Sequence, residues 1–175
     1  MIQAKQREPR LYRFEDDGRT PNNARLPLVL YCDAFDPLQG RDPAATCEAL
    51  FAFHGWTGSW RNGIHGFLHF HAGCHEVLGI VRGEALVQFG GDKGSNLAVK
   101  AGDVAVLPAG TGHRRLSASG DLLVVGAYPS AGPYDQWRPG EIGHTAALER
   151  IAAVPAPAQD PVYGRDGPLT RLWAH

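Results

Sequence analysis

Within residues 63–83, GIHGFLHFHAGCHEVLGIVRG, eight consecutive positions of an otherwise apolar run hold three histidines and a glutamate: His69, His71, His75 and Glu76. His69 and His71 are separated by one residue, so on an extended strand both imidazoles would point to the same side. Ala72-Gly73 indicates a bend, after which Glu76 would begin a second strand that returns its carboxylate over the pair. Imidazole with carboxylate suits a borderline transition metal better than calcium or magnesium. A single His-x-His is also common surface chemistry, so this segment alone leaves both interpretations open.

A further candidate ligand is His113, in the segment 102–117, GDVAVLPAGTGHRRLS. A β-type run at Val104–Leu107 is followed by a turn rich in proline and glycine at 108–112. A return strand that begins at His113 could bring its ring to the same place as the His pair.

These two segments resemble the paired motifs of the cupin superfamily. The first fits G-x5-H-x-H-x4-E-x6-G, with its fixed positions at Gly63, His69, His71, Glu76 and Gly83. The second fits G-x5-P-x-G-x2-H-x3-N at Gly102, Pro108, Gly110 and His113, with Ser117 where the pattern has Asn. That last position is not a metal ligand in the family. Further stretches at 15–31, 55–64, 75–83, 123–129 and 160–169 resemble the YjlB-like small bacterial cupins, so the resemblance runs from about Tyr12 to Trp173.

The resemblance implies an all-β double-stranded β-helix, which is a jelly-roll-type cupin barrel, with a few short flanking helices. We expect residues 1–175 to form a single domain. It would comprise an N-terminal arm at about 1–25, a barrel core at about 26–130, and a C-terminal helix with an ordered tail at about 140–175.

The four candidate metal ligands are His69, His71, Glu76 and His113. With a divalent ion they give a net charge of +1 and, in an octahedral site, two open positions, which a catalytic metal needs. We expect one divalent transition metal, with Fe, Mn, Ni and Zn all compatible. The alternative is a degenerate site that no longer binds metal.

Composition is that of an ordinary globular protein, with 43% hydrophobic and 20% charged residues. The formal net charge is −1 and there is no basic stripe, so nothing favours nucleic acid or an anionic membrane. No segment is apolar and long enough to span a membrane, and the first residues have no apolar leader. Three cysteines at unrelated spacings argue against a disulfide framework and for a reducing compartment. The cytoplasm is therefore the expected location.

Several short strands follow one another with turns every eight to twelve residues, as in a sandwich or barrel. Leu26–Tyr31 is expected as a strand in which Pro27 favours an edge position. Asp42 is expected to cap a helix that starts at Pro43 and ends by Gly55, with an apolar face on the barrel exterior. A second helix is expected at Thr145–Val154. The tail after it is too rich in proline and glycine for helix, but carries enough large apolar residues to be ordered.

Four residues near the motifs each have a functional and a structural interpretation. Trp56 and Trp60 could wall a pocket, although large aromatics mostly fill cores. Arg61 could meet an anionic substrate or form a surface ion pair. His75 could be a general base, or lie outside the ligand shell because strand alternation turns it away from Glu76. We carry Arg61 and His75 forward as candidate catalytic residues.

Two functions remain open. The first is a metal-dependent enzyme acting on a small polar metabolite, with a carboxylate favoured by Arg61 and the positive site. It would use either O2-dependent oxidation or Lewis-acid isomerase or lyase chemistry. The second is a non-catalytic protein that binds or senses a small molecule or the metal. A homodimer is expected, because the arm and tail could cover a neighbour's exposed strand edges.

Overall fold

The computed structural model describes residues 7–174, so residues 1–6 of the predicted arm and His175 lie outside the described residues. Its elements in chain order are β1 (Arg10–Tyr12), β2 (Leu28–Tyr31), α1 (Pro43–Phe53), β3 (Thr57–Asn62), β4 (Glu76–Arg82), β5 (Glu84–Phe89), β6 (Ser95–Lys100), β7 (Val104–Leu107), β8 (His113–Ala118), β9 (Leu123–Tyr128), α2 (His144–Ala153) and α3 (Pro168–Leu172).

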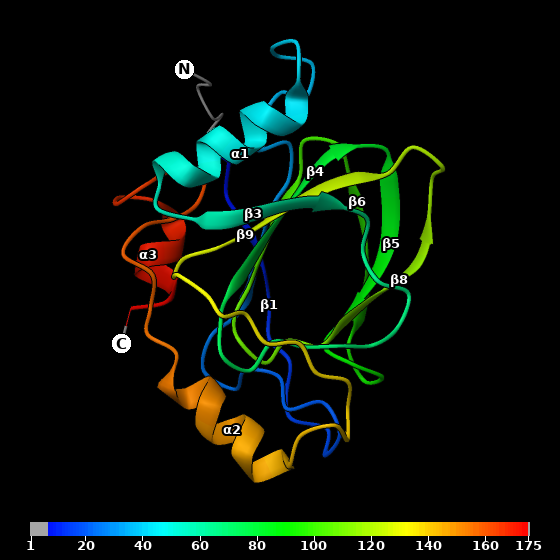
Figure 1. Cartoon of the computed structure of the whole chain (residues 1–175), viewed down its shortest axis with the longest axis vertical. Coiled ribbons are helices and arrows are strands. Elements are labelled where there is room, and N and C mark those ends of the chain that lie inside the picture. Colours follow the sequence, from blue (N-terminus) through cyan, green and yellow to red (C-terminus); the bar gives the residue numbers. More distant parts are fainter. Residues whose placement is uncertain (1–6, 175) are drawn as a thin grey trace.

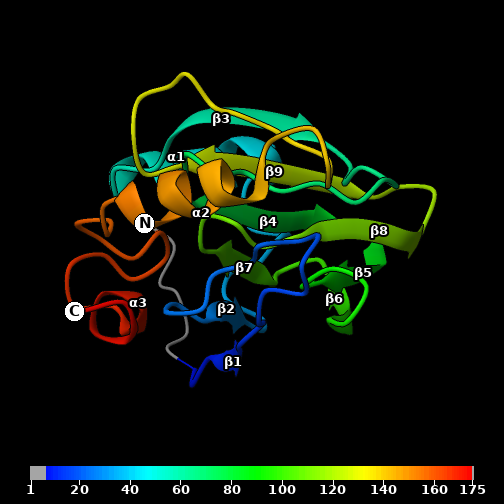
Figure 2. The same cartoon turned by 90° about the horizontal axis from the view of Figure 1, so that it is seen from below.

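The strands form two antiparallel sheets that face each other (Figures 1 and 2). The larger sheet has the order β1-β2-β7-β4-β9-β3, and the smaller one has the order β6-β5-β8. Figure 2 shows the six strands of the larger sheet rising from β1 to β3, with β5, β6 and β8 gathered at one side. This arrangement confirms the expected all-β, jelly-roll-type double-stranded β-helix with a few short helices.

Strand β4 lies near the middle of the larger sheet and is buried on both faces. Leu78 and Ile80 face the barrel interior, where they pack with residues of β2, β5 and β7. Val77 and Val81 face the opposite side and join a second apolar cluster beneath α1. Since alternate residues of a strand point to opposite faces, this strand contributes to both cores.

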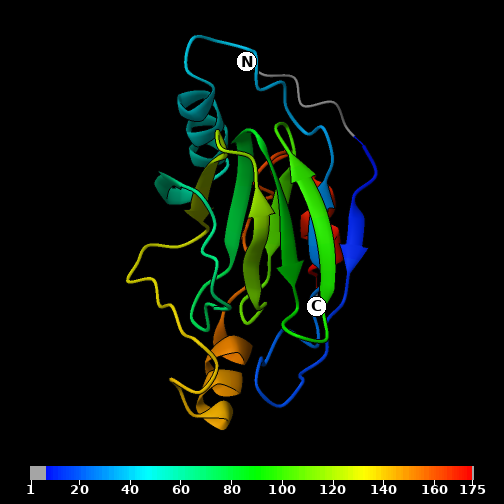
Figure 3. The same ribbon diagram turned by 90° about the vertical axis from the view of Figure 1, so that its right-hand side faces the viewer.

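Helix α1 covers the outer face of the larger sheet (Figures 1 and 3). Asp42 caps it as expected, because its carboxylate accepts hydrogen bonds from the backbone N–H groups of Ala44 (3.0 Å) and Ala45 (3.2 Å). Cys47 and Phe51 are buried on the helix face that meets β4. The close approach requires Gly79, since a Cβ atom there would lie 2.5 Å from the Cys47 sulfur.

The tail that follows α2 is ordered and packs on the body of its own chain. Trp173 is 1% exposed and donates a hydrogen bond from Nε1 to the Pro27 carbonyl at 2.9 Å. The buried carboxylate of Asp160 accepts hydrogen bonds from the Tyr31 hydroxyl and from the backbone N–H of Leu169. The segment therefore completes the apolar cluster beneath α1.

Three local expectations were wrong. β2 is not an edge strand, because β1 pairs with its outer side. The tail contains a short helix, α3, which Pro168 can start because a first-turn residue needs no N–H. Residues 57–62 form strand β3, although no strand was expected there. Within residues 7–174, no helix has both the length and the apolar character needed to cross a membrane.

Candidate metal centre

Three histidines converge at one end of the barrel interior. His69 and His71 lie in the irregular segment between β3 and β4, and His113 is the first residue of β8. His69 and His113 exchange backbone hydrogen bonds of 3.2 and 2.9 Å, which aligns their side chains. Their ring centroids are 4.1 Å apart. One nitrogen from each of the three rings lies within 4.8 Å of the others, a spacing that could hold a metal ion.

The other nitrogen of each ring is held by a backbone carbonyl. Nδ1 of His69 lies 3.0 Å from the Phe67 oxygen, and Nδ1 of His113 lies 3.0 Å from the Thr111 oxygen. Nδ1 of His71 lies 2.6 Å from the Asp135 oxygen. A carbonyl can only accept, so each Nδ1 carries a hydrogen, and in the neutral ring each Nε2 keeps its lone pair. Metal-binding histidines in proteins have this arrangement.

Glu76, the first residue of β4, brings a carboxylate to the same place. Its Oε2 atom lies 3.0 Å from Nε2 of His71 and 3.4 Å from Nε2 of His113. Glu76 is 3% exposed, and this oxygen makes no well-directed hydrogen bond among the described residues. A buried carboxylate oxygen without a directed donor needs another partner. A cation between the oxygen and the two lone pairs would satisfy all three atoms.

The charges of these groups are strongly coupled. Burial and the neighbouring His113 lower the pKa of His69 to about 3. Burial also lowers the pKa of His71, but the Glu76 carboxylate outweighs it and the net pKa rises to about 9. Burial raises the pKa of Glu76, yet the facing His71 and His113 hold it well below its usual range. In the absence of a metal, a proton shared by His71 and Glu76 supplies the positive charge that the carboxylate requires.

The residues fit a divalent transition metal. Three neutral imidazoles and one carboxylate form a mixed nitrogen and oxygen donor set of the kind that Fe, Mn, Ni and Zn accept. The donor atoms are buried, their tautomers are fixed, and a cation would replace the proton between His71 and Glu76.

A cavity of about 270 Å³ opens onto the four residues. Apolar walls come from Trp60, Ile64 and Leu78, and polar groups come from residues that include Tyr128 and Gln136. Tyr128 and Gln136 were missed in the sequence, since both lie far along the chain from the two motifs. Tyr128 ends β9, which pairs with β4, and that pairing carries its ring to the site.

No protein-family model matches the chain. The chain is 40% identical over 170 residues to an uncharacterised protein named YjlB from Bacillus subtilis, and the match covers 96% of this chain and 98% of that protein. The chain belongs to the YjlB-like group of cupins.

Solved structures similar to this YjlB-like cupin are more distant. An acireductone dioxygenase from Bacillus anthracis, with cadmium in its active centre, is 15% identical with a TM-score of 0.38, over 50% of this chain and 60% of that one. A dTDP-6-deoxy-D-glucose-3,5-epimerase from Legionella pneumophila is 12% identical with a TM-score of 0.40, over 75% and 77% of the two chains. An oxalate decarboxylase from Bacillus subtilis gives 15% identity and a TM-score of 0.40, over 74% of this chain and 33% of that one.

His75 of this YjlB-like cupin is not among the residues that line the cavity, which agrees with the alternative that it lies outside the ligand shell. Its ring points away from Glu76 and lies 4.8 Å from the ring of Trp173. Nδ1 accepts a hydrogen bond from the Ala109 N–H at 2.9 Å, and Nε2 donates to the Pro155 carbonyl at 3.1 Å. Burial lowers the pKa of His75 to about 4. Both nitrogens are therefore engaged with backbone groups outside the cavity.

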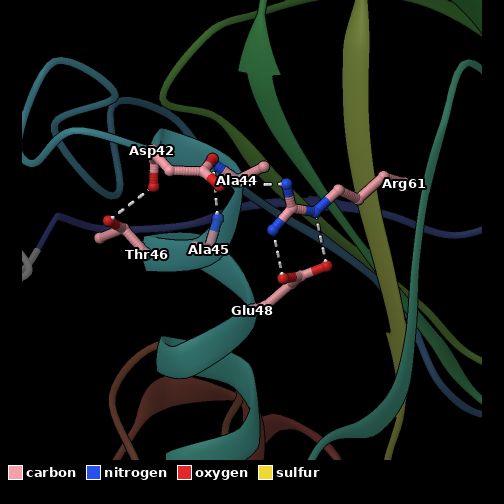
Figure 4. A network of polar contacts seen from close by, with 6 residues as sticks. All are labelled: Asp42, Ala44, Ala45, Thr46, Glu48 and Arg61. Carbon is pink, nitrogen blue, oxygen red and sulfur yellow. Dashed lines mark hydrogen bonds and ion pairs between the residues drawn. The ribbon is translucent and has the colours of Figure 1, made fainter.

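Arg61 lies on β3 at the cavity rim, but its guanidinium turns toward α1 (Figure 4). It pairs with both oxygens of Glu48, at 2.9 and 2.7 Å, and with Asp42 at 3.1 Å. These contacts hold β3 against the start of the helix. The expected contact with an anionic substrate is therefore not supported, because two carboxylates already neutralise the charge.

The two tryptophans differ. Trp56 is a core residue whose Nε1 donates to the Gln159 carbonyl, so it does not wall the pocket. Trp60 lines the cavity and donates from Nε1 to the Tyr128 hydroxyl at 3.0 Å. Sequence reasoning favoured packing for both residues, and for Trp60 the alternative of a pocket wall is the correct one.

Proposed function

We propose that this YjlB-like cupin binds one divalent transition metal through His69, His71, His113 and Glu76, and that it is a metal-dependent enzyme acting on a small polar molecule, with carboxylates as the favoured class. When bound, the metal supplies Lewis acidity and, if it is iron, access to O2 chemistry. The two reaction classes, oxidation and isomerase or lyase chemistry, use the same donor set.

The observation that carries the proposal is the buried Glu76 oxygen between two imidazole nitrogens with no directed donor. The adjoining cavity supports a catalytic rather than a purely structural site. A structural metal site closes its shell with protein ligands, whereas this one faces a volume that could hold roughly nine water molecules at about 30 Å³ each. A small metabolite fits that volume.

Metal analysis of protein made without a histidine tag tests the metal site. We expect about one ion per chain in the wild type, and less than about a tenth of an ion after the double substitution His71→Ala and His113→Ala, since two of four donors are lost. His144→Ala is the matched control, because His144 is a half-buried histidine paired with Asp16 outside the site. Full metal content in the double variant would contradict the ligand assignment.

The enzyme assignment needs a separate experiment. Thermal-shift screening of a metabolite library on metal-loaded and metal-free protein should find ligands that raise the melting temperature of the loaded form alone. Each ligand would then be tested for turnover with Fe, Mn, Ni and Zn, in the presence and absence of O2. Turnover that requires Fe and O2 identifies an oxygenase, and turnover with several metals without O2 identifies Lewis-acid chemistry. Ligand binding without turnover under any condition would favour the non-catalytic binding protein.

A further inference from the structure

The cavity contains a second polar anchor besides the three histidines and Glu76. Tyr128 is 6% exposed and lines the cavity at the end of β9. The ring centroids of His71 and Tyr128 are 6.3 Å apart, and the Glu76 carboxylate is close enough to raise the pKa of Tyr128 together with burial. The phenol therefore stands beside the place where a cation and its ligand would lie.

Three neighbours fix the orientation of this phenol. Trp60 donates to the Tyr128 oxygen, so the hydroxyl hydrogen points to an acceptor within the cavity. In the metal-free protein the nearby Glu76 carboxylate is such an acceptor, and a cation bound to Glu76 would release the hydrogen for a ligand. Tyr134 stacks on the ring with centroids 3.7 Å apart and an interplanar angle of 19°. Gly126 makes room for the Trp60 indole, since a side chain at that position would collide with it. A phenol with one stacked face and a hydroxyl oxygen held by an indole N–H is restrained in position, and it can donate to an oxygen acceptor in the cavity.

The charges of the lining residues limit what that acceptor is. Three neutral imidazoles, one carboxylate and a divalent cation leave a single positive charge. Arg61 is the one guanidinium among the described residues that line the cavity, and Asp42 and Glu48 neutralise it. One negative charge on a ligand therefore balances the site, whereas a second would be buried without a partner. The apolar side chains of Ile64 and Leu78 face the remaining volume.

We propose that Tyr128, aligned by Trp60, donates a hydrogen bond to the carboxylate of the substrate, and that the substrate is a monocarboxylate with a short apolar portion. The inference rests on the proposed function, because it requires a cation at the four-residue centre. In this arrangement the cation balances the negative charge of the substrate, and Tyr128 orients its carboxylate. Arg61, which the sequence suggested as the anion contact, takes neither role.

Cobalt(II)-loaded protein tests this inference, with the absorption spectrum of the ion reporting on ligand binding. Three probes of similar size differ in charge: propionate, malonate and propionamide. We expect propionate to shift the spectrum with the lowest Kd. Tyr128→Phe should raise that Kd roughly tenfold or more, the effect of losing a hydrogen bond to a charged group. Tyr163→Phe is the matched control. Tyr163 packs against Tyr31 in the cluster beneath α1 and does not line the cavity, so loss of its hydroxyl should change the Kd less than about twofold.

The possible results distinguish a failure of the proposed metal site from a failure of the role given to Tyr128. If wild-type protein binds no cobalt, the proposed function fails and this inference falls with it. If cobalt binds at one ion per chain but Tyr128→Phe binds propionate like the wild type, only the role of Tyr128 is overturned. Tighter binding of malonate or propionamide than of propionate overturns the substrate class. Equal cobalt content in both tyrosine variants shows that a change in Kd does not arise from damage to the metal centre.

Discussion

His75 and Glu76 are neighbours in sequence, but their side chains lie in different surroundings. Glu76 opens onto the cavity, whereas His75 is enclosed between Trp173 and two backbone groups. The difference follows from strand alternation, which points consecutive side chains to opposite faces. One residue therefore serves the candidate site and the next one serves the core.

The buried neutral ring of His75 makes folding sensitive to acid. Its pKa in the folded protein is lowered to about 4, below the ordinary value of about 6.5, so as pH falls the unfolded chain takes up a proton before the folded one does. The stability contribution is complete above about pH 6.5 and is lost toward pH 4. Between pH 7 and pH 5 we expect this residue alone to remove roughly 2 kcal/mol from the free energy of unfolding.

Urea denaturation at the two pH values, with His75→Gln for comparison, measures this effect. Glutamine can donate and accept but does not titrate, so the variant should lose roughly 2 kcal/mol less between pH 7 and pH 5 than the wild type. His69, whose pKa is also lowered, contributes equally to both proteins and cancels in the comparison. An identical pH dependence in the two proteins would contradict the assignment.

The sequence predicted the four convergent residues because motif spacing encodes them directly. It could not place the Arg61 side chain, since that required knowing that residues 57–62 form a strand and which face meets α1. It also missed Tyr128, which reaches the site through the pairing of β9 with β4. Long-range strand pairing leaves no local signal in the chain.

Elements with strong local patterns were predicted within one or two residues, including α1, β7 and α2. Two strands were not. β3 has the sequence TGSWRN and lacks alternating apolar residues, so only its pairing with β9 makes it a strand. β1 is three residues long and exists through its pairing with β2. Tertiary contacts decide both cases.

The contact between α1 and β4 gives a prediction at this scale. Gly79→Ala places a methyl group 2.5 Å from the Cys47 sulfur and 2.9 Å from the Phe51 ring, and we expect it to lower the free energy of unfolding by roughly 1–3 kcal/mol. The double variant Gly79→Ala with Cys47→Ala should lose less stability than the sum of the losses of the two single variants. The second substitution removes the sulfur atom with which the new methyl group would collide. Chemical denaturation of the single and double variants measures both quantities.

Gly120→Ala is the control for this experiment, since nothing lies within 4 Å of a Cβ atom at that position. It should change stability by less than about 0.5 kcal/mol. Strict additivity of Gly79→Ala and Cys47→Ala would mean that the helix shifts as a whole rather than through this contact.

At the scale of the whole molecule, the C-terminal tail packs against the larger sheet. Trp173 packs beneath β2 and beside His75, so removal of its side chain affects both the sheet and the turn that follows β7. We expect Trp173→Ala to lower the free energy of unfolding by about 3–5 kcal/mol. Trp173→Phe, which keeps most of the apolar area but loses the hydrogen bond to Pro27, should cost less than half as much. Equal stability of all three proteins in urea would contradict the packing role of the tail.

The expected homodimer and the cytoplasmic location stay predictions. The larger sheet ends in β1 and β3, and the smaller sheet has β6 at one edge, so strand edges exist that a second copy could cover. Light scattering at micromolar concentration distinguishes a dimer from a monomer of 18.9 kDa.

The ordered tail also bears on how the chain is made. Residues that close the core beneath α1, among them Leu169 and Trp173, come after every strand of the barrel. During translation the barrel strands leave the ribosome first, while the outer face of β4 still lacks its final cover. Burial of that face therefore has to await the tail, and we expect the cluster beneath α1 to form after the strands of the barrel have been synthesised.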